Sequence, residues 1–299
     1  WHKFLDEVTG GDVDYQLFLQ RVIGYCAGGS THEHAMFFLY GDGGNGKGIF
    51  LNTITAIMGD YAKTAPMDTF TNSSNDRHPT DMAMLQGARM VFAQETERGR
   101  AWAESRVKSL TGSDPVTARF MRQDFFTYTP KFKLLISGNH LPRLKNVDEA
   151  MRRRLHLLPF TQVFKGKDRD PHLAEKLKTE YAGILQWIVE GAVAYQRDDL
   201  SPPLVVREAS DGYLESQDLF KRWLDECCEQ SAVLFEAPMK LFNSFKDFAD
   251  ASNEIVGSYV EFRQSLERAG FTSGNSKAKN GRYWQGLSLK KMGASSRSF

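Results

Sequence analysis

The chain has 299 residues, of which 41% are hydrophobic and 25% charged, and its formal net charge at pH 7 is +1. This length allows one large domain or two ordinary ones, and the composition is that of a globular protein, which excludes an intrinsically disordered chain. No apolar run is long enough for a membrane-spanning helix and no signal peptide starts the chain, so we expect no membrane partner. A net charge near zero leaves nucleic-acid binding open, because such binding depends on local clusters of charge.

The cysteines and the first residue bear on where the chain comes from. Cys26 and the adjacent pair Cys227 and Cys228 have neither the spacing of a metal site nor that of a disulfide framework. This favours a reducing compartment, and we expect the cytoplasm. The chain begins with Trp1 and not with Met, so we expect either a piece of a larger protein, with a further domain upstream, or a processed chain.

Two helices are predicted before the first strand. Apolar residues recur at helical intervals through residues 1–27, and Gly10, Gly11 and Asp12 interrupt them. We expect residues 1–30 to form a helical collar. Residues 35–40 are then almost wholly apolar, as the residues of a buried strand are.

A glycine-rich loop that ends in lysine follows this strand directly. Its residues are Gly41, Asp42, Gly43, Gly44, Asn45, Gly46, Lys47 and Gly48. Glycines let successive backbone N–H groups turn toward a phosphate, the helix predicted to follow offers its positive end, and the lysine ammonium reaches the β- and γ-phosphates. The loop therefore predicts a site for a nucleoside triphosphate, which we take to be ATP. A ligand-free turn between a strand and a helix is the alternative, but such a turn needs neither so many glycines nor the lysine.

Acidic residues follow a second buried strand, residues 88–93. The strand leads into Gln94, Glu95, Thr96 and Glu97. Carboxylates at this edge of a sheet can hold Mg²⁺ and orient the water that attacks a phosphate. We predict Glu95 as the catalytic base, and Glu95 and Glu97 as magnesium ligands. The alternative is that these acids only cap the next segment, as acids at strand ends often do.

Residues 116–121 and 125–128 are rich in threonine and aromatic residues and predict a β-hairpin. The cations Arg119 and Arg122, with Lys131 after the hairpin, alternate with aromatic rings, so this segment has groups for both the phosphates and the bases of DNA. The rings could equally serve only to pack the hairpin. A third buried strand, residues 132–137, precedes Asn139, whose amide could touch the γ-phosphate and the attacking water, although an asparagine in such a place is often only a turn residue.

Three consecutive arginines, residues 152–154, precede a fourth strand over residues 155–160. Arginine supplied by a neighbouring subunit stabilises the charge that develops in phosphoryl transfer, and this would imply an oligomer. The other interpretation is a basic surface patch, or ion pairs with Asp148 and Glu149. Because strands alternate with helices over residues 31–200, we expect a parallel α/β sheet whose ligands lie at the carboxyl ends of its strands.

Residues 201–299 predict a separate domain. After a proline-containing linker we expect one helix over residues 205–230, two amphipathic helices over residues 239–251 and 258–269, and a strand pair over residues 271–289. Two helices followed by a basic hairpin are the pattern of a winged helix. Lys277, Lys279 and Arg282, beside the aromatic residues Tyr283 and Trp284, are candidates for DNA contacts, and a solvated basic tail is the alternative.

In this order along the chain, the motifs resemble the helicase portion of superfamily III DNA helicases, in particular that of phage, satellite-phage, plasmid and poxvirus primase-helicases. The matching segments are residues 41–47, the strand that ends in residues 94–97, residues 108–114, residues 134–140, and Asp148, Ala150, Arg153 and Arg154 before Pro159 and Phe160. The resemblance covers nearly the whole chain.

This resemblance implies an AAA+ ATPase core that works as a hexameric ring. ATP would be hydrolysed with Mg²⁺ between subunits, where Arg153 and Arg154 would act on the neighbour's site, and Arg119 and Arg122 would belong to a hairpin in the central pore. The implied partners are single-stranded and forked DNA, further copies of the chain, and an upstream primase domain or other replication proteins. A phage-type relative further implies the cytoplasm of a bacterial host.

Two positions depart from the family pattern where a metal ion would bind. Gly48 stands where the loop usually has a serine or threonine whose hydroxyl binds Mg²⁺, and Gln94 stands where many ATPases have an aspartate. Two other functions therefore remain open: a DNA-stimulated ATPase that remodels or loads proteins without unwinding DNA, and an inactive origin-binding or replication-interfering module that binds nucleotide without turnover.

Overall fold

The computed structural model describes residues 1–72, 80–95, 100–144, 147–252, 254, 256–276 and 281–290. It divides into two compact units, Trp1–Leu214 and Glu215–Phe299. Each unit has hydrophobic clusters of its own. The unit boundary therefore differs from the predicted boundary at residue 200, and the assignment of segments to a collar, a motor core and a winged helix stays a prediction.

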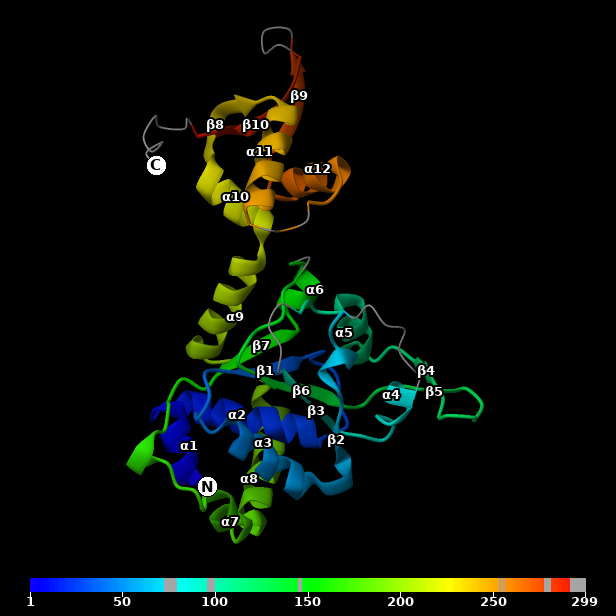
Figure 1. Ribbon diagram of the computed structural model, residues 1–299, viewed down its shortest axis with the longest axis vertical. Helices are drawn as coiled ribbons and strands as arrows, with labels where there is room; N and C mark the ends of the chain where they lie inside the picture. The colour runs from blue at the N-terminus through cyan, green and yellow to red at the C-terminus, as the bar shows by residue number, and fades with distance from the viewer. Residues whose placement is uncertain are drawn as a thin grey trace. The chain divides into compact units, whose positions relative to one another are not determined.

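A five-stranded parallel sheet forms the centre of the first unit (Figure 1). Its strands are β1 (Met36–Tyr40), β2 (Ala62–Thr64), β3 (Met90–Glu95), β6 (Lys133–Gly138) and β7 (Leu155–Pro159), in the spatial order β2-β3-β6-β1-β7. Every adjacent pair runs parallel. The predicted parallel α/β sheet is thus confirmed. Strand β1 lies between β6 and β7, so the segments that follow β1 and β6 leave the sheet side by side.

Helices cover both faces of this sheet, which explains why its strands are apolar on both sides. On one face, helices α1 (His2–Thr9), α2 (Val13–Ala27), α3 (Lys47–Met58), α7 (Leu173–Lys178) and α8 (Tyr181–Asp198) pack against Phe37, Leu39 and Phe92. On the other, α5 (Glu104–Thr111), α6 (Glu149–Arg152) and residues 209–214 of α9 (Leu204–Gln217) pack against Phe38, Val91 and Ile136. The first thirty residues therefore share one hydrophobic cluster with the sheet.

Helices α2 and α8 cross at two glycines. A Cβ atom on Gly24 would lie 2.1 Å from the backbone nitrogen of Ala192, and one on Gly191 would lie 2.1 Å from the carbonyl oxygen of Gln20. The side chain of Gln20 also donates a 2.9 Å hydrogen bond to the carbonyl of Trp187. The two backbones can approach this closely only because neither glycine has a side chain.

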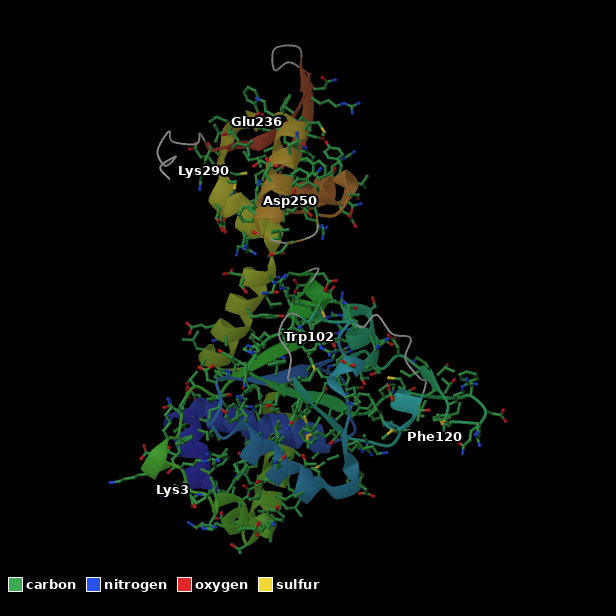
Figure 2. The ribbon with its side chains drawn as sticks, in the orientation of Figure 1. Lys3, Trp102, Phe120, Glu236, Asp250 and Lys290 are labelled. Carbon is green, nitrogen blue, oxygen red and sulfur yellow. The ribbon has the colours of Figure 1, made fainter. Side chains whose placement is uncertain are left out.

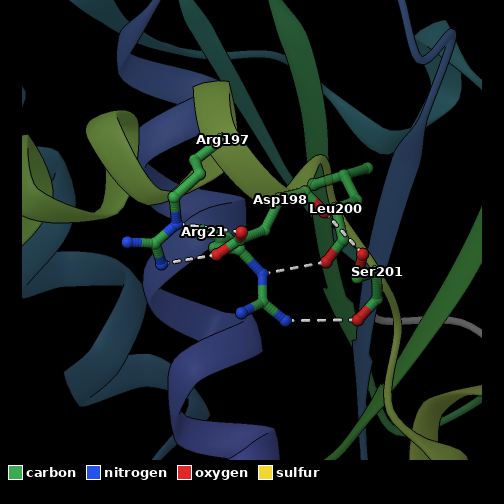
Figure 3. Close-up of polar contacts among 5 residues, drawn as sticks. All are labelled: Arg21, Arg197, Asp198, Leu200 and Ser201. Carbon is green, nitrogen blue, oxygen red and sulfur yellow. Dashed lines mark hydrogen bonds and ion pairs between the residues drawn. The ribbon is translucent and has the colours of Figure 1, made fainter.

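Arg21, which lies on α2, holds that helix to the chain just after α8 (Figure 3). Its guanidinium donates hydrogen bonds to the carbonyl oxygens of Leu200, at 3.0 Å, and Ser201, at 3.2 Å. Next to it, Arg197 makes two hydrogen bonds to the carboxylate of Asp198, at 2.9 and 2.6 Å. The first helices are thereby held to the C-terminal part of the same unit by polar as well as apolar contacts.

The predicted hairpin is present as a separate two-stranded sheet. Strand β4 (Val116–Ala118) pairs antiparallel with β5 (Phe126–Tyr128), and Figure 1 shows the hairpin extending from the side of the unit. The phenol of Tyr128 donates a 2.6 Å hydrogen bond to the carbonyl of Met82 in helix α4 (Thr80–Ala83). Short 3-10 helices complete the unit: η1 (Gly59–Tyr61), η2 (Met67–Thr69) and η3 (Gly166–Asp168).

The second unit differs from the prediction at its start. The structure has α10 (Leu219–Cys227), β8 (Cys228–Glu236), α11 (Pro238–Ala251), α12 (Tyr259–Arg268), β9 (Thr272–Ser276) and β10 (Gly281–Leu289). A single helix over residues 205–230 is therefore wrong. Helix α9 ends at Gln217, Asp218 caps a new helix by accepting a hydrogen bond from the backbone of Lys221, and β8 pairs antiparallel with β10.

The strand order of this small sheet is β8-β10-β9, and its core is aromatic. Trp223, Phe245, Phe262 and Trp284 pack together there. Trp284 is only 2% exposed, so its ring belongs to this core although basic residues surround it in the sequence. No helix within the described ranges is long and apolar enough to cross a membrane.

Candidate functional site

The loop between β1 and α3 has backbone angles that require glycine. Gly41, Gly44 and Gly46 have φ angles of 145°, 79° and 87°. A Cβ atom on Gly41 would lie 2.1 Å from the carbonyl oxygen of Phe160, and one on Gly46 would lie 2.7 Å from Val8. Backbone geometry and close packing therefore require glycine at these positions. After this turn the chain begins α3 at Lys47.

Lys47 is folded back over its own loop. It is 6% exposed, and its ammonium donates to the carbonyl oxygen of Gly41 at 2.5 Å and to the amide oxygens of Asn45 at 3.2 Å and Asn139 at 3.3 Å. Burial lowers the pKa of Lys47, and the nearby carboxylate of Asp42 acts in the opposite direction. The ammonium of Lys47 therefore lies inside the loop, next to the amino end of α3.

Asn139 reaches this ammonium from the neighbouring strand. Strand β6 is paired with β1, with Ser137 opposite Leu39, and Asn139 is the first residue beyond the end of β6. The sequence placed Asn139 near the phosphate loop only by order along the chain. The structure brings the two residues into hydrogen-bonding contact.

Strand β3 ends at the same edge of the sheet. Gln94 is paired with Ser137 and Glu95 with Gly138, and the side chain of Gln94 is exposed in the cleft above the loop. The backbone of Glu95 is therefore one strand spacing, about 4.8 Å, from β6. Glu97, the second predicted metal ligand, lies outside the described residues, and the structure describes only the backbone of Glu95.

A cleft of about 1060 Å³ opens above the loop. Its far wall comes from the segment after β7, which is attached to the loop by a 2.9 Å hydrogen bond from the backbone of Phe164 to the carbonyl of Gly44. Lys167 and Arg169 line this wall, and Phe4, Phe164 and Leu173 add apolar surface. Cations beside the loop and an apolar wall suit the two ends of a nucleotide.

Sequence reasoning did not identify this far wall. Lys165, Lys167 and Arg169 form a basic run a few residues after a predicted strand, and this was the available signal. However, their position beside the loop depends on a contact between Gly44 and Phe164, which no local pattern predicts.

The amino end of α3 can accommodate an anion and has room for a metal ligand. The helix has twelve residues, and its N-cap, Gly46, has no side chain to bond its first N–H groups. A Cβ atom on Gly48 would meet nothing within 4 Å. Among the described residues that line the cleft, those with oxygen-bearing side chains are Glu7, Asn45, Asn52, Gln94, Ser137, Asn139, Asp168, Asp170 and Glu180. These groups fit a magnesium–triphosphate whose metal is held largely by phosphate oxygens and water.

Arg153 and Arg154 lie at the amino ends of the parallel strands, opposite the carboxyl ends where the glycine-rich loop lies. Strand β7 begins after them and is parallel to β1, and the backbone of Met36, the first residue of β1, donates a 2.7 Å hydrogen bond to the carbonyl of Arg154. The five residues of β1 therefore separate these arginines from the loop by about 17 Å. Neither guanidinium is placed to serve the loop of its own chain.

The two arginines differ in their surroundings. Arg154 is 6% exposed and donates to the hydroxyl of Thr111, at 3.1 Å, and to the carbonyl of Ala150, at 2.8 Å. Arg153 is exposed and lines a separate cavity of about 450 Å³. The guanidinium of Arg153 is therefore the accessible one of the two, whereas Arg154 is directed into its own chain.

The predicted DNA-binding residues of the hairpin surround its tip. The guanidinium of Arg119 lies 4.6 Å from the ring centre of Phe125, and Arg122 has a φ angle of 59° in the connecting turn. Met121 and Phe125 are 70% and 59% exposed, and Figure 2 shows Phe120 on this projection. Cations and accessible aromatic surface are thus combined at the tip.

The remaining DNA candidates are more scattered. Lys131 is exposed between β5 and β6, and Arg282 is exposed on β10. Lys277 and Lys279 lie outside the described residues. The contacts of all these residues with DNA stay predictions.

Similar proteins are found by sequence and by structure. A family of unknown function, DUF5906, matches residues 39–154, which extend from the end of β1 to Arg154. A proposed helicase of Acanthamoeba polyphaga mimivirus, L207/L206, is 25% identical over 72% of this chain and 24% of its own length. A proposed helicase of Frog virus 3, 022R, is 23% identical over 80% of this chain and 26% of its own length. The chain thus spans about a quarter of the curated relatives that it matches.

The fold has been solved before in another protein. The apo C-terminal region of NrS-1 superposes on this chain with a TM-score of 0.62 and 9% identity, over 96% of this chain and 75% of that one. A second structure of that region, in its A form, has a TM-score of 0.60 and 10% identity, over 75% of this chain and 52% of that one. The chain therefore shares the fold of the NrS-1 C-terminal region and has viral relatives that are named as proposed helicases.

Proposed function

We propose that the chain is the motor part of an ATP-dependent replicative DNA helicase of superfamily III. In this proposal residues 31–200 are an AAA+ core, residues 1–30 its collar, and residues 201–299 carry a winged helix. The observation that carries the proposal is the contact between Lys47 and Asn139, which joins the glycine-rich loop to a polar amide on the adjacent strand. Relatives named as helicases, in mimivirus and Frog virus 3, support the same class of activity.

At the loop, each group has a distinct task. The glycine-rich backbone and the amino end of α3 bind the phosphates, and the Lys47 ammonium exchanges contacts with its own loop for contacts with phosphate oxygens. Asn139 orients the water and the terminal phosphate, and Glu95 acts as the base. Mg²⁺, when bound, neutralises phosphate charge, and Glu95 and Glu97 stay its predicted ligands beside Gln94.

The distance between the loop and Arg153 supports a ring. Because Arg153 is about 17 Å from the loop of its own chain, it can stabilise phosphoryl transfer only at the loop of another copy. A closed ring, and a hexamer in the family that the sequence resembles, satisfies every such site with one repeated interface.

DNA binding is assigned to two parts of the chain. The hairpin tip with Arg119, Arg122 and Phe125 would contact single-stranded DNA, with Lys131 nearby. In the second unit, the order α10, β8, α11, α12, β9, β10 suits a winged helix that carries Arg282, Lys277 and Lys279. An upstream primase domain, forked DNA as substrate, and the cytoplasm of a bacterial host remain predictions of the resemblance.

ATP turnover in the presence and absence of single-stranded DNA tests this proposal. We expect DNA-stimulated phosphate release by the parent, and its loss in Glu95→Gln and in Arg153→Ala, because one variant removes the base and the other the trans-acting charge. Removal of an arginine finger lowers turnover by about 10³-fold or more. Arg207→Ala, an exposed arginine on α9, is the matched control and should keep the parent rate. Parent-like turnover in Arg153→Ala would contradict the trans assignment.

An inactive nucleotide-binding module is the second candidate, and Gly48 and Gln94 are the observations that favour it. Neither residue supplies the metal ligand that the usual loop and strand provide. This candidate predicts that ATP binds to the purified chain and that no phosphate is released with DNA present. The same assay therefore separates the two functions.

A further inference from the structure

Two cations on the far wall of the cleft have no task in the proposed function. Lys167 and Arg169 line the cleft of about 1060 Å³ above the glycine-rich loop, and both side chains are exposed. Within the described part of the chain, neither side chain takes part in a hydrogen bond or an ion pair. Both are therefore available to a ligand in the cleft.

One backbone hydrogen bond holds this wall beside the loop. The N–H of Phe164 donates to the carbonyl of Gly44 at 2.9 Å, and the short helix η3 follows directly. Within it, the N–H of Asp168 donates to the carbonyl of Lys165 at 3.1 Å, which fixes the turn that carries Lys167. The backbone of Lys167 can lie no more than about 10 Å from that of Phe164, which itself contacts the loop.

The charges that line the cleft leave an excess of cations. Three of its four carboxylates are already in ion pairs: Glu7 with Lys3 at 3.7 Å, Asp170 with Lys176 at 2.6 Å, and Glu180 with the amino group of Trp1. Asp168 is the fourth. Lys47, Lys167 and Arg169 therefore stand against one carboxylate, so the cleft favours an anion.

The same cleft has few protein ligands for a metal ion. Gly48 has no side chain to offer, and Gln94 has a neutral amide where many ATPases have a carboxylate. In phosphoryl-transfer sites the metal ion neutralises much of the phosphate charge. A chain that holds this ion weakly needs other positive groups near the phosphates, and the far wall has two.

We propose that Lys167 and Arg169 bind the phosphates of the nucleotide held by the loop of the same chain, and that they neutralise charge which Mg²⁺ neutralises in the usual site. This inference rests on the proposed function and adds the segment after β7 to its nucleotide site. The Arg169 guanidinium can bind two phosphate oxygens at once, whereas the Lys167 ammonium acts as a point charge. Nucleotide binding therefore depends only partly on Mg²⁺.

Binding of a fluorescent ATP analogue, measured with Mg²⁺ and with EDTA, tests this without any turnover. In EDTA we expect Lys167→Gln and Arg169→Gln each to weaken binding about three- to fivefold, and the double variant about ten- to twentyfold. With Mg²⁺ the double variant should lose only about threefold, because the metal ion lowers the phosphate charge that the cations meet. The losses should decrease from ATP to ADP to AMP.

Lys165→Gln is the matched control. Lys165 is exposed on the same segment, two residues before Lys167, and is not among the residues that line the cleft. This variant should bind ATP like the parent in both conditions, and Arg169→Lys should keep most of the affinity in EDTA because it keeps the charge. Equal losses in Lys165→Gln and Lys167→Gln, or losses that do not depend on Mg²⁺, overturn the inference.

Two further ligands identify the source of the phosphate. Inorganic tripolyphosphate has the same charge as the nucleotide tail but cannot contact the apolar wall, so it should bind more weakly than ATP. Equal or tighter binding would assign the cations to a free polyphosphate and overturn the inference. Affinity for single-stranded DNA should be the same in the parent and the double variant. A loss of DNA binding with unchanged ATP binding would also overturn it.

The outcomes separate this inference from the proposed function. ATP binding with the expected pattern of losses, but without DNA-stimulated phosphate release by the parent, contradicts the helicase and supports the inference. Phosphate release by the parent, with variants that bind ATP like the parent in EDTA, supports the helicase and overturns the inference. No binding of ATP by the parent in either condition overturns both.

Discussion

Gly48 is the residue at which this loop departs most clearly from its usual form. The position is exposed at the start of α3, and a Cβ atom there would meet nothing within 4 Å. A serine therefore fits without any rearrangement. The loop therefore lacks a hydroxyl at this position although there is room for one.

We predict that Gly48→Ser tightens the use of Mg²⁺. The hydroxyl would add one metal ligand, so the Mg²⁺ concentration for half-maximal ATP turnover should fall about three- to tenfold, or about 1 kcal/mol. A magnesium titration at saturating ATP measures this, with Gly183→Ser on α8 as a control at another open glycine. An unchanged midpoint would mean that the metal shell is complete without residue 48.

His156 makes stability depend on pH. Its ring on β7 stacks on Phe37, with centroids 5.5 Å apart, and lies near Phe18. Burial lowers its pKa from 6.5 to about 4. Because the unfolded chain binds this proton more readily, His156 reduces stability as the pH falls from 6.5 toward 4, and by about 2 to 3 kcal/mol at the end of that range.

We therefore predict that His156→Phe flattens the loss of stability in acid. Phenylalanine can stack in the same place but cannot take up a proton. Urea unfolding of the parent and the variant at pH 7 and pH 4.5 gives the two differences in free energy, and that of the variant should be smaller by about 2 kcal/mol. Equal pH dependence in both proteins would show that the ring is not protonated on unfolding.

Among the elements, α2 and α8 can cross closely because Gly24 and Gly191 have no side chains. We predict that Gly24→Ala or Gly191→Ala destabilises the first unit by about 1 to 3 kcal/mol, because each new Cβ would meet backbone at 2.1 Å. Gly183→Ala on the same helix meets nothing within 4 Å and should stabilise the unit by up to about 1 kcal/mol. Thermal unfolding of the three variants measures this contrast, and similar shifts in all of them would refute the close crossing.

The elements differ in how far the sequence determines them. The strands of the large sheet are continuous apolar runs because both faces are covered, so β1, β3, β6 and β7 could be predicted. Strand β8 could not, since most of its residues are exposed and only its pairing with β10 defines it. Strand β2 has three residues at the edge of the sheet, too few to show a period.

The residues of the candidate site also differ in how far the sequence determines them. The glycine-rich loop and Asn139 could be identified because local chemistry and order along the chain mark them. The inward direction of Arg154 depends on Thr111, and the position of Lys167 depends on the contact between Gly44 and Phe164. Contacts between segments this far apart in the sequence leave no local pattern.

At the scale of the whole molecule, the phosphate loop and Arg153 lie at opposite edges of one sheet. In the proposed function these are two halves of one site, which a single copy could not close by itself. If the proposed function holds, activity requires assembly, and we predict that turnover per subunit rises with protein concentration.

Strand displacement from a forked duplex is the decisive measurement. The parent should release the displaced strand only when ATP and Mg²⁺ are present, and Lys47→Ala should release none, because the ammonium that binds the phosphates is gone. Lys63→Ala, whose ammonium bonds only the carbonyl of Gln86 among the contacts described for it, is the matched control and should match the parent. Unwinding by Lys47→Ala at the parent rate would contradict an ATP-driven helicase.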